Sequence, residues 1–330
     1  MHDIITFGSA TKDIFIKTKN VKVLNDKKNF ITGKGVCFNL GSKVDIEEMD
    51  FASGGGGTNT AVEFANQGFR VAYCGCLGND LSAHEIINEL KAFNIDTSFI
   101  VRTDKKATNH SIVLEGIDSD RTILVYRGAS EELRKEDIMW DKIQAKWFYI
   151  APLSGKLFNI FDHLLDFAVK NNIKVALNPG STMLTLPPAK IKEVLKKVDI
   201  LLLNQEEASV ITKIPYSKEK EVFKKLDELC PGIAIMTKGE MGAVVSDGKD
   251  IYSAPALKAK VADKTGAGDS FGSGFVSGYI QSNGDIVSAL QLGIANSAAC
   301  LKGLGAKGEL LKKGQKFDKV HVNIHPCRKN

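Results

Sequence analysis

The chain has 330 residues, of which 44 are Lys or Arg and 39 are Asp or Glu, so its formal net charge is +5. The basic excess is small and scattered, and 43% of the residues are hydrophobic. This composition excludes a disordered tail protein and requires neither a nucleic acid nor a membrane as a partner. No apolar run approaches the roughly 18 residues of a membrane-spanning helix, and the chain starts with a strand-like segment rather than a leader, so we expect a cytoplasmic protein.

Residues 14–53 contain short alternating stretches without a helical stripe, and two similar β-like segments follow at 109–115 and 121–126. We place all of these in one small β-sheet that projects from the main domain. Built from about 14–53 and 109–127, this sheet is predicted to form a lid over the ligand-binding edge. The sequence has no internal repeat and no linker, so a single domain over 1–330 is predicted.

A run of four glycines, Gly54 to Gly57, comes shortly before the first good helical segment, Ala61 to Gln67. Four glycines allow the backbone to approach a small ligand closely, and the Asn59 amide offers both donors and an acceptor to hydroxyl groups. The run therefore indicates a binding site for a small polar molecule. Shortly after it, Cys74 and Cys76 share one face of a strand-like segment, which favours packing over a redox pair.

From about residue 140 onward, apolar strands alternate with amphipathic helices, the pattern of βαβ units and a mainly parallel sheet. The segment from Lys156 to Lys170 carries a single apolar stripe, typical of a helix that covers a sheet. Strand-like runs lie at 147–150, 175–177, 200–203 and 233–236, and three of them end in polar or glycine residues. Ligands bind at that edge of an open α/β sheet, so these ends are candidate site residues: Asn178-Pro179-Gly180, Asn204-Gln205-Glu206-Glu207 and Thr237-Lys238-Gly239.

The strongest signal is residues 263–271, Asp-Lys-Thr-Gly-Ala-Gly-Asp-Ser-Phe, which precede a helical pattern. Gly266, Ala267 and Gly268 lack bulk, so their backbone N–H groups can converge at the helix N-terminus and stabilise negative charge. Asp269, in the first turn, is placed to accept a proton from a hydroxyl beside the same anion site. A base and an anion hole this close together are what phosphoryl transfer to an alcohol requires.

These motifs also allow other interpretations, in which the residues have structural roles or the protein belongs to another functional class. Taken alone, Asp269 is a favourable acid in a first helical turn, Asp13 a solvated turn residue and Glu207 a helix-start acid. No Walker G-x-x-x-x-G-K-[ST] sequence occurs, and Phe271 stands where a dinucleotide fingerprint needs its third glycine. A nicotinamide dehydrogenase is thus disfavoured, and a non-catalytic ligand-binding regulator is disfavoured because Asp269 and Glu207 are both present.

Together these motifs resemble the ribokinase-like, or PfkB, family of carbohydrate and nucleoside kinases. The resemblance covers essentially the whole chain, and its motifs occur in the expected order: Gly8-Ser9, Gly55-Gly56-Gly57-Thr58-Asn59 and Thr265-Gly266-Ala267-Gly268-Asp269. It implies an α/β fold, a three-layer αβα sandwich with a mainly parallel sheet and a small β lid. It also implies transfer of the γ-phosphoryl group of ATP to a hydroxyl of a sugar or nucleoside.

The same resemblance implies roles for individual residues. For catalysis these are Asp269 as the base and Gly266, Ala267 and Gly268 as the anion hole. For the acceptor they are Asp13, Gly55, Gly56, Gly57 and Asn59. For ATP they are Asn178, Asn204, Thr237, Gly239, Gly242 and Asn296. For metals they are Glu207, which with Asn204 organises Mg²⁺ through water, and Asp263, which joins a K⁺ site with carbonyls of 303–306. A homodimer through the lid is a further expectation.

The chain departs from ribokinases proper, which usually carry Asn and Lys where this sequence has Thr11 and Gly56. These changes leave fewer fixed donors and more room at the glycine run, which favours a larger acceptor such as a nucleoside. Within the same class, a sugar-phosphate kinase is the alternative. In that case Arg121 or Arg127 of the lid segment would bind the phosphate that the acceptor already carries.

Overall fold

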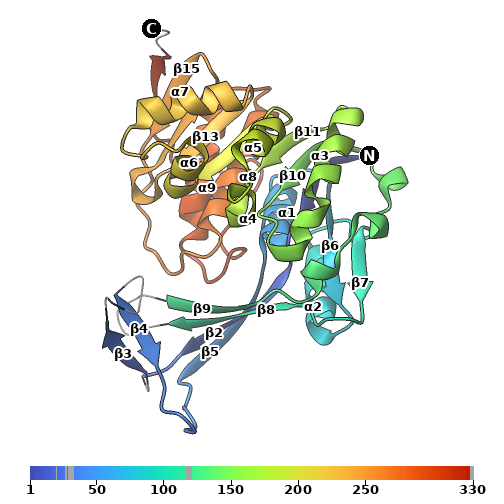
Figure 1. Ribbon diagram of the computed structural model, residues 1–330, viewed down its shortest axis with the longest axis vertical. Helices are drawn as coiled ribbons and strands as arrows, with labels where there is room; N and C mark the ends of the chain where they lie inside the picture. The colour runs from blue at the N-terminus through green and yellow to red at the C-terminus, as the bar shows by residue number, and fades with distance from the viewer. Residues whose placement is uncertain (20, 27, 29–32, 116–120, 328–330) are drawn as a thin grey trace.

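The computed structural model describes residues 1–19, 21–26, 28, 33–115 and 121–327. Its centre is a ten-stranded sheet with the strand order β16-β15-β14-β13-β12-β11-β10-β1-β6-β7 (Figure 1). Seven strands are parallel: β1 (His2–Phe7), β6 (Val71–Gly78), β7 (Ile100–Thr103), β10 (Ala145–Ile150), β11 (Lys174–Leu177), β12 (Ile200–Asn204) and β13 (Ile233–Thr237). Three antiparallel strands complete one edge: β14 (Ala243–Ser246), β15 (Asp250–Ala254) and β16 (Asn323–Pro326).

Helices cover both faces of this sheet, which explains why its strands are continuous apolar runs. One face packs against α1 (Gly56–Asn66), α2 (Leu81–Ala92), α8 (Ala267–Gln281) and α9 (Ile286–Cys300). The other packs against α3 (Phe161–Lys170), α4 (Gly180–Leu184), α5 (Pro188–Leu195), α6 (Gln205–Thr212) and α7 (Glu219–Leu229). Short 3₁₀ helices lie at η1 (Ala129–Glu132), η2 (Lys135–Asp137), η3 (Trp140–Lys142), η4 (Gly155–Ile160) and η5 (Gly239–Met241). The predicted three-layer αβα sandwich is confirmed.

Two helices differ from their predicted bounds. The segment expected to be one helix from Lys156 to Lys170 is a 3₁₀ helix up to Ile160 and an α-helix from Phe161 onward, a common way for a helix to start. The helix predicted at Ala61 to Gln67 begins five residues earlier, at Gly56. Glycine weakens a helix by about 1 kcal/mol relative to Ala, so a glycine run does not predict a helix start. Close packing of this helix against β1 compensates here.

The small second sheet has the order β5-β2-β8-β9 and consists of β2 (Thr11–Lys17), β5 (Glu48–Gly54), β8 (Asn109–Glu115) and β9 (Arg121–Tyr126). A hairpin of β3 (Lys22–Asn25) and β4 (Lys34–Cys37) lies at its far end, and Figure 1 shows the sheet projecting from the main body. The two ends of the segment 14–53 thus lie in one sheet with strands of 109–127, whereas β3 and β4 form a separate two-stranded sheet. We call this sheet the lid.

Strand pairing assigns each lid residue to a face, because paired residues point to the same side. Asp13 pairs with Ala52 and Ser111, and Ser111 pairs with Val125. This side, which we call the inner face, also carries Phe15, Val113, Ile123 and Arg121. The opposite, outer face carries a row of apolar side chains: Phe51, Ile14, Ile112 and Leu124.

The base of the lid is bonded to the main body. The Lys12 ammonium donates to Glu85 of α2 at 2.6 Å, and the Lys307 ammonium donates to Ser53 at 2.8 Å and to Glu89 of α2 at 2.9 Å. The lid is thus fixed over one end of the main sheet. Among the described residues, no helix is long and apolar enough to cross a membrane.

Candidate active site

The carboxyl ends of the parallel strands meet at one edge of the main sheet, as the sequence predicted. Asn204 at the end of β12 pairs directly with Thr237 at the end of β13, and Asn178 follows β11, the neighbour of β12. Asn204 is exposed, while Asn178 and Thr237 are partly exposed. The three polar strand ends therefore lie side by side on an accessible edge.

Gly55 and Gly57 of the glycine run pack against neighbouring protein atoms and do not face an open cavity. A Cβ on Gly55, whose φ is +95°, would lie 2.4 Å from the Ser9 carbonyl oxygen, and a Cβ on Gly57 would lie 2.7 Å from the Tyr73 ring. The Gly57 N–H also donates to the Ser9 carbonyl at 3.1 Å. Gly55 and Gly57 are needed so that the run can pack on the turn after β1, which differs from the predicted direct approach to a ligand.

The two other glycines of the run lie near carboxylates. A Cβ on Gly54 would lie 2.0 Å from Oδ2 of Asp13, and a Cβ on Gly56 would lie 3.6 Å from Oδ1 of Asp269. Residues two apart in a chain are separated by at most about 7 Å between Cα atoms. The run therefore brings a lid carboxylate and a carboxylate of α8 to the same short stretch of backbone.

Asp269 is partly exposed, and it is bonded to the helix that follows the glycine run. The Asn59 amide donates to its Oδ2 at 2.8 Å, across 210 residues of sequence. Burial raises the pKa of Asp269, and the Asn59 bond offsets part of this rise because it stabilises the ionised carboxylate. Oδ1 of Asn59 is buried and has no hydrogen-bond partner, so one polar atom of this amide is left to bind a group from outside.

The N-terminus of α8 lies next to Asp269 and is not capped by a side chain. Gly266 is its N-cap in the left-handed conformation, with φ +77°, and a Cβ there would lie 2.2 Å from Ala306. Gly268 is exposed, and nothing would lie within 4 Å of a Cβ on it. The first N–H groups of a helix have no partner within it, so this end presents free donors and a positive dipole end to an open space.

Asn204 and Glu207 bond to each other at the start of α6. The Asn204 N–H donates to Oε2 of Glu207 at 2.9 Å, and the Glu207 N–H donates to Oδ1 of Asn204 at 2.8 Å. This is a capping box, so Glu207 does have the structural role at a helix start that the sequence allowed. That role does not exclude a second one in the site. Burial raises the pKa of Glu207, and the bond from the Asn204 N–H opposes the rise. Only Oε2 takes part in the box, so Oε1 is not used by it.

The segment from Thr237 to Gly242 forms a tight turn beside Asn204. Its Lys238 N–H donates to the Gly242 carbonyl at 2.8 Å. Gly242 has φ +90°, and a Cβ there would lie 2.0 Å from the Ala254 carbonyl oxygen, whereas a Cβ on Gly239 would meet nothing within 4 Å. Gly242 is therefore required by the fold of the turn, and Gly239 lies at its open surface.

Asn296 does not lie with the other predicted nucleotide residues. Its side chain is fully buried, and its amide donates to the Ser270 carbonyl at 2.9 Å and accepts from the Leu311 N–H at 2.9 Å. The expectation that it faces ATP does not fit this environment. It instead holds the backbone of the first turn of α8 from behind.

The structure adds contacts that the sequence did not predict, and one further buried acid. Burial raises the pKa of Asp13, and both a hydrogen bond with Ser111 and the charge of Lys307 oppose the rise. Glu63 of α1 is fully buried, and burial raises its pKa to about 8. Arg121, considered above for a phosphate, is bonded to Asp263. These contacts join residues far apart in the chain, so no local pattern signals them.

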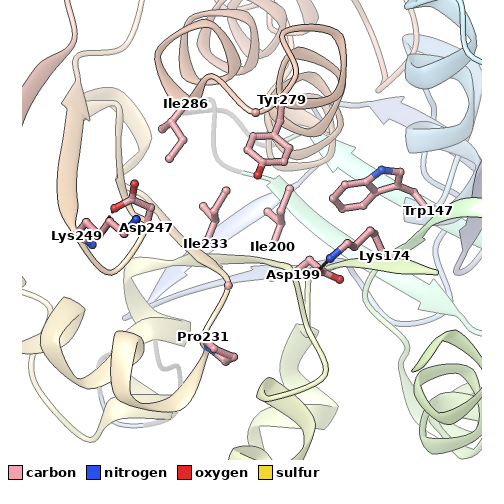
Figure 2. A pocket seen from close by; sticks show the side chains of 12 residues that line it. Trp147, Lys174, Asp199, Ile200, Pro231, Ile233, Asp247, Lys249, Tyr279 and Ile286 are labelled. Atoms are coloured by element: carbon pink, nitrogen blue, oxygen red, sulfur yellow. Dashed lines mark hydrogen bonds and ion pairs between the residues drawn. The ribbon is translucent and has the colours of Figure 1, made fainter. Parts of the chain in front are cut away.

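A hollow lies at the opposite edge of the sheet (Figure 2). It measures about 390 Å³ and opens where β11, β12 and β13 begin, beside Lys174, Asp199 and Ile233. Lys174 donates to Asp199 at 2.8 Å, so two of its charges already neutralise each other. None of the predicted site residues lines it.

Comparison with known proteins decides the family. Residues 19–312 match the model of the pfkB family carbohydrate kinases. The chain belongs to this family. It is therefore a phosphotransferase with an alcohol group as acceptor, which confirms the reaction class predicted from the sequence, and members of the family use ATP with a divalent metal ion.

Relatives support this assignment over most of the chain. The chain is 27% identical to a ribokinase of Staphylococcus aureus (strain COL) over 278 residues, or 82% of this chain and 89% of the relative. It is 25% identical to a deoxyribokinase of Salmonella typhi over 272 residues, or 81% and 87%. In fold it resembles the Arabidopsis thaliana ribokinase complexed with ribose and ATP, with a TM-score of 0.76, 21% identity and coverage of 94% and 96%. It also resembles the Methanocaldococcus jannaschii nucleoside kinase, with a TM-score of 0.75, 20% identity and coverage of 94% and 95%.

The Asn59–Asp269 bond predicts how the pH profile responds to mutation. If Asp269 acts as a base, activity is lost as the pH falls through its pKa, which burial has already raised. Asn59→Ala removes the donor that lowers this pKa, so the acid limb of kcat/KM should move to higher pH. Asn171→Ala, which removes an exposed amide at the end of α3, should leave the profile in place. An unmoved acid limb in Asn59→Ala would show that this bond does not tune the base.

Proposed function

We propose that the carboxylate of Asp269 deprotonates the acceptor hydroxyl while the N-terminus of α8 stabilises charge on the transferred phosphoryl group. One observation carries this proposal: the glycine run borders both Asp13 and Asp269. An acceptor lying on the run meets a lid carboxylate on one side and a base on the other. The backbone N–H groups of Gly266, Ala267 and Gly268 lie within one helical turn of that base. The Ala267 N–H makes a long bond to the Lys264 carbonyl, at 3.4 Å.

The proposed steps follow from these positions. Asp13 accepts hydrogen bonds from hydroxyl groups of the acceptor, and the unpartnered Oδ1 of Asn59 accepts from another. Asp269, held by the Asn59 amide, takes the proton of the reacting hydroxyl. The α8 amides stabilise the charge that spreads over the phosphoryl oxygens during transfer.

The nucleotide is proposed to lie along the exposed strand ends. Asn178, Asn204, Thr237 and Gly239 share this accessible edge, and Gly242 shapes the turn that closes it. In this proposal the phosphates point toward the N-terminus of α8 and Asp269, since helix N-termini bind phosphate groups. Asn296 contributes only by supporting the first turn of α8 from behind.

The donor set at Asn204 and Glu207 fits Mg²⁺ held through water. Glu207 uses Oε2 in the capping box and keeps Oε1 for a water bound to the ion. Mg²⁺ keeps several waters when it binds phosphates, so a single second-sphere carboxylate is sufficient here. When bound, the ion supplies positive charge that offsets the charge of the phosphate oxygens.

A nucleoside fits the inner face of the lid better than a free sugar does. Ile123 and Val125 lie on the same face as Asp13, and they are 43% and 57% exposed. Exposed apolar side chains beside a diol-binding carboxylate suit a ligand with a polar ribose and a flat apolar base. Val125 also lines a small pocket with Thr11 and Arg127, where the phosphate of a sugar phosphate is the competing occupant.

ADP formation should be measured with ATP, Mg²⁺ and ribose, fructose, fructose 6-phosphate, adenosine or cytidine. We expect the highest kcat/KM for a nucleoside, and a lower value for its deoxy analogues, because a missing hydroxyl leaves a buried polar group unpaired. A strong preference for free ribose would refute the nucleoside proposal. No ADP formation with any acceptor would refute the proposed function.

The proposed metal role predicts a selective effect on Mg²⁺. Glu207→Gln keeps an oxygen for the capping box but loses the charge that orders water around the ion, so half-maximal rate should need more Mg²⁺ with little change in acceptor KM. Glu206→Gln is the matched control, since Glu206 lies in the same helical turn without taking part in the box. Identical Mg²⁺ titrations for the two variants would remove Glu207 from the site.

We also propose a homodimer through the outer face of the lid, in the cytoplasm. Phe51, Leu124 and Met49 are each more than half exposed on that face, and exposed apolar patches mark interaction surfaces. Six cysteines without disulfides suit a reducing compartment. Sedimentation should give a dimer for the wild type and a monomer for Leu124→Glu, and a wild-type monomer at micromolar concentration would contradict the proposal.

A further inference from the structure

One arginine crosses from the lid to the main body next to the anion hole. Arg121 begins β9 on the inner face of the lid, and its Nη1 donates to Oδ1 of Asp263 and to Oγ1 of Thr265, each at 2.7 Å. Asp263 is buried, with 7% of its side chain exposed, and Arg121 is 33% exposed. The bond therefore lies in a partly desolvated place, where an ion pair is stronger than on an open surface.

The carboxylate of Asp263 already accepts four hydrogen bonds, one of them from a positive charge. Its Oδ1 accepts from Arg121, from the Thr265 N–H at 2.9 Å and from the Thr265 hydroxyl at 2.8 Å, while Oδ2 accepts from the Gly305 N–H at 3.0 Å. Three of these donors converge on Oδ1, and Oδ2 has one. The K⁺ expected at Asp263 from the sequence does not fit this donor set, because a positive guanidinium already lies against the carboxylate.

The bonded residues shape the anion hole directly. Thr265 immediately precedes Gly266, the N-cap of α8, and Gly305 precedes Ala306, against which Gly266 packs. Asp263 is thus bonded both to Thr265, which precedes Gly266, and to Gly305, which precedes Ala306. These two neighbours determine the backbone position of Gly266. A charge that holds Asp263 in place also holds the α8 amides in place.

We infer that Arg121 is a positioning residue that replaces a monovalent cation: its guanidinium supplies the positive charge that orders the 263–268 loop and the anion hole. Because this charge belongs to the lid, the anion hole depends on the contact between the lid and the main body. Kinase activity is then independent of K⁺ and dependent on Arg121. The inference rests on the proposed anion hole.

The first test needs no mutation. Turnover and thermal unfolding of the wild-type protein are measured in KCl, NaCl and tetramethylammonium chloride at equal ionic strength. We expect the same turnover and the same melting temperature in all three salts, since a bound ion would raise the melting temperature. Activation by KCl, or a higher melting temperature in KCl alone, would overturn the inference.

The second test compares Arg121→Ala, Arg121→Lys and, as a matched control, Arg134→Gln, which breaks an exposed Arg–Asp pair outside the site. Arg121→Ala should lower kcat about 10-fold or more, toward the cost of losing an oxyanion-hole donor, with smaller changes in KM for ATP and acceptor. Guanidinium or K⁺ at moderate concentration should restore part of that loss, and Arg121→Lys should retain part of the rate. Arg134→Gln should behave as the wild type does.

The outcomes separate this inference from the proposed function. Wild-type kcat in Arg121→Ala would overturn the inference. So would a loss that neither guanidinium nor K⁺ repairs in a variant that melts like the wild type, since the missing charge would then not be the cause. If Arg121→Ala does not fold, Arg121→Lys and the wild-type salt series still decide. The proposed function fails separately, if the wild type phosphorylates no acceptor in any salt.

Discussion

The close contact between the glycine run and the turn after β1 is the constraint on which the rest of the site depends. At this turn the chain passes from the main sheet into the lid, and at the glycine run it returns from β5 of the lid to α1 of the main body. The two crossings touch, because Gly55 and Gly57 have no side chain to separate them from Ser9 and Tyr73. The lid is therefore fixed where Asp13 and Asp269 must meet.

This geometry buries the carboxyl groups of Asp13 and Asp269, and burial disfavours their ionised forms. Burial raises the pKa of both Asp13 and Asp269. Hydrogen bonds with Ser111 and Asn59 oppose these rises, and so does the charge of Lys307 for Asp13. Burial in turn lowers the pKa of Lys307, while its bond to Glu89 opposes that shift. Such partly compensated groups are typical of catalytic sites, where a base must be ionised and still reactive.

The sequence predicted those features that depend on residues close together in the chain. Apolar runs predicted the parallel strands, the polar residues after them predicted the accessible edge at Asn204 and Thr237, and the small residues before Asp269 predicted an uncapped helix start. The features it missed depend on contacts between distant segments. Asn59 lies 210 residues from Asp269 and Arg121 lies 142 from Asp263. The packing of the lid and of the helices on the main body brings these pairs together, and the packed helices enclose Asn296.

Replacing the proposed base by its isosteric amide tests the account at its centre. Asp269→Asn keeps the size of the side chain and an oxygen that can accept the Asn59 bond, but the amide cannot take a proton from the acceptor. Single-turnover rates with ATP and the best acceptor should fall by about 10²–10⁴, the usual contribution of a positioned general base, while the melting temperature stays near that of the wild type. A variant that folds normally and transfers phosphate at a comparable rate would show that Asp269 is not the base.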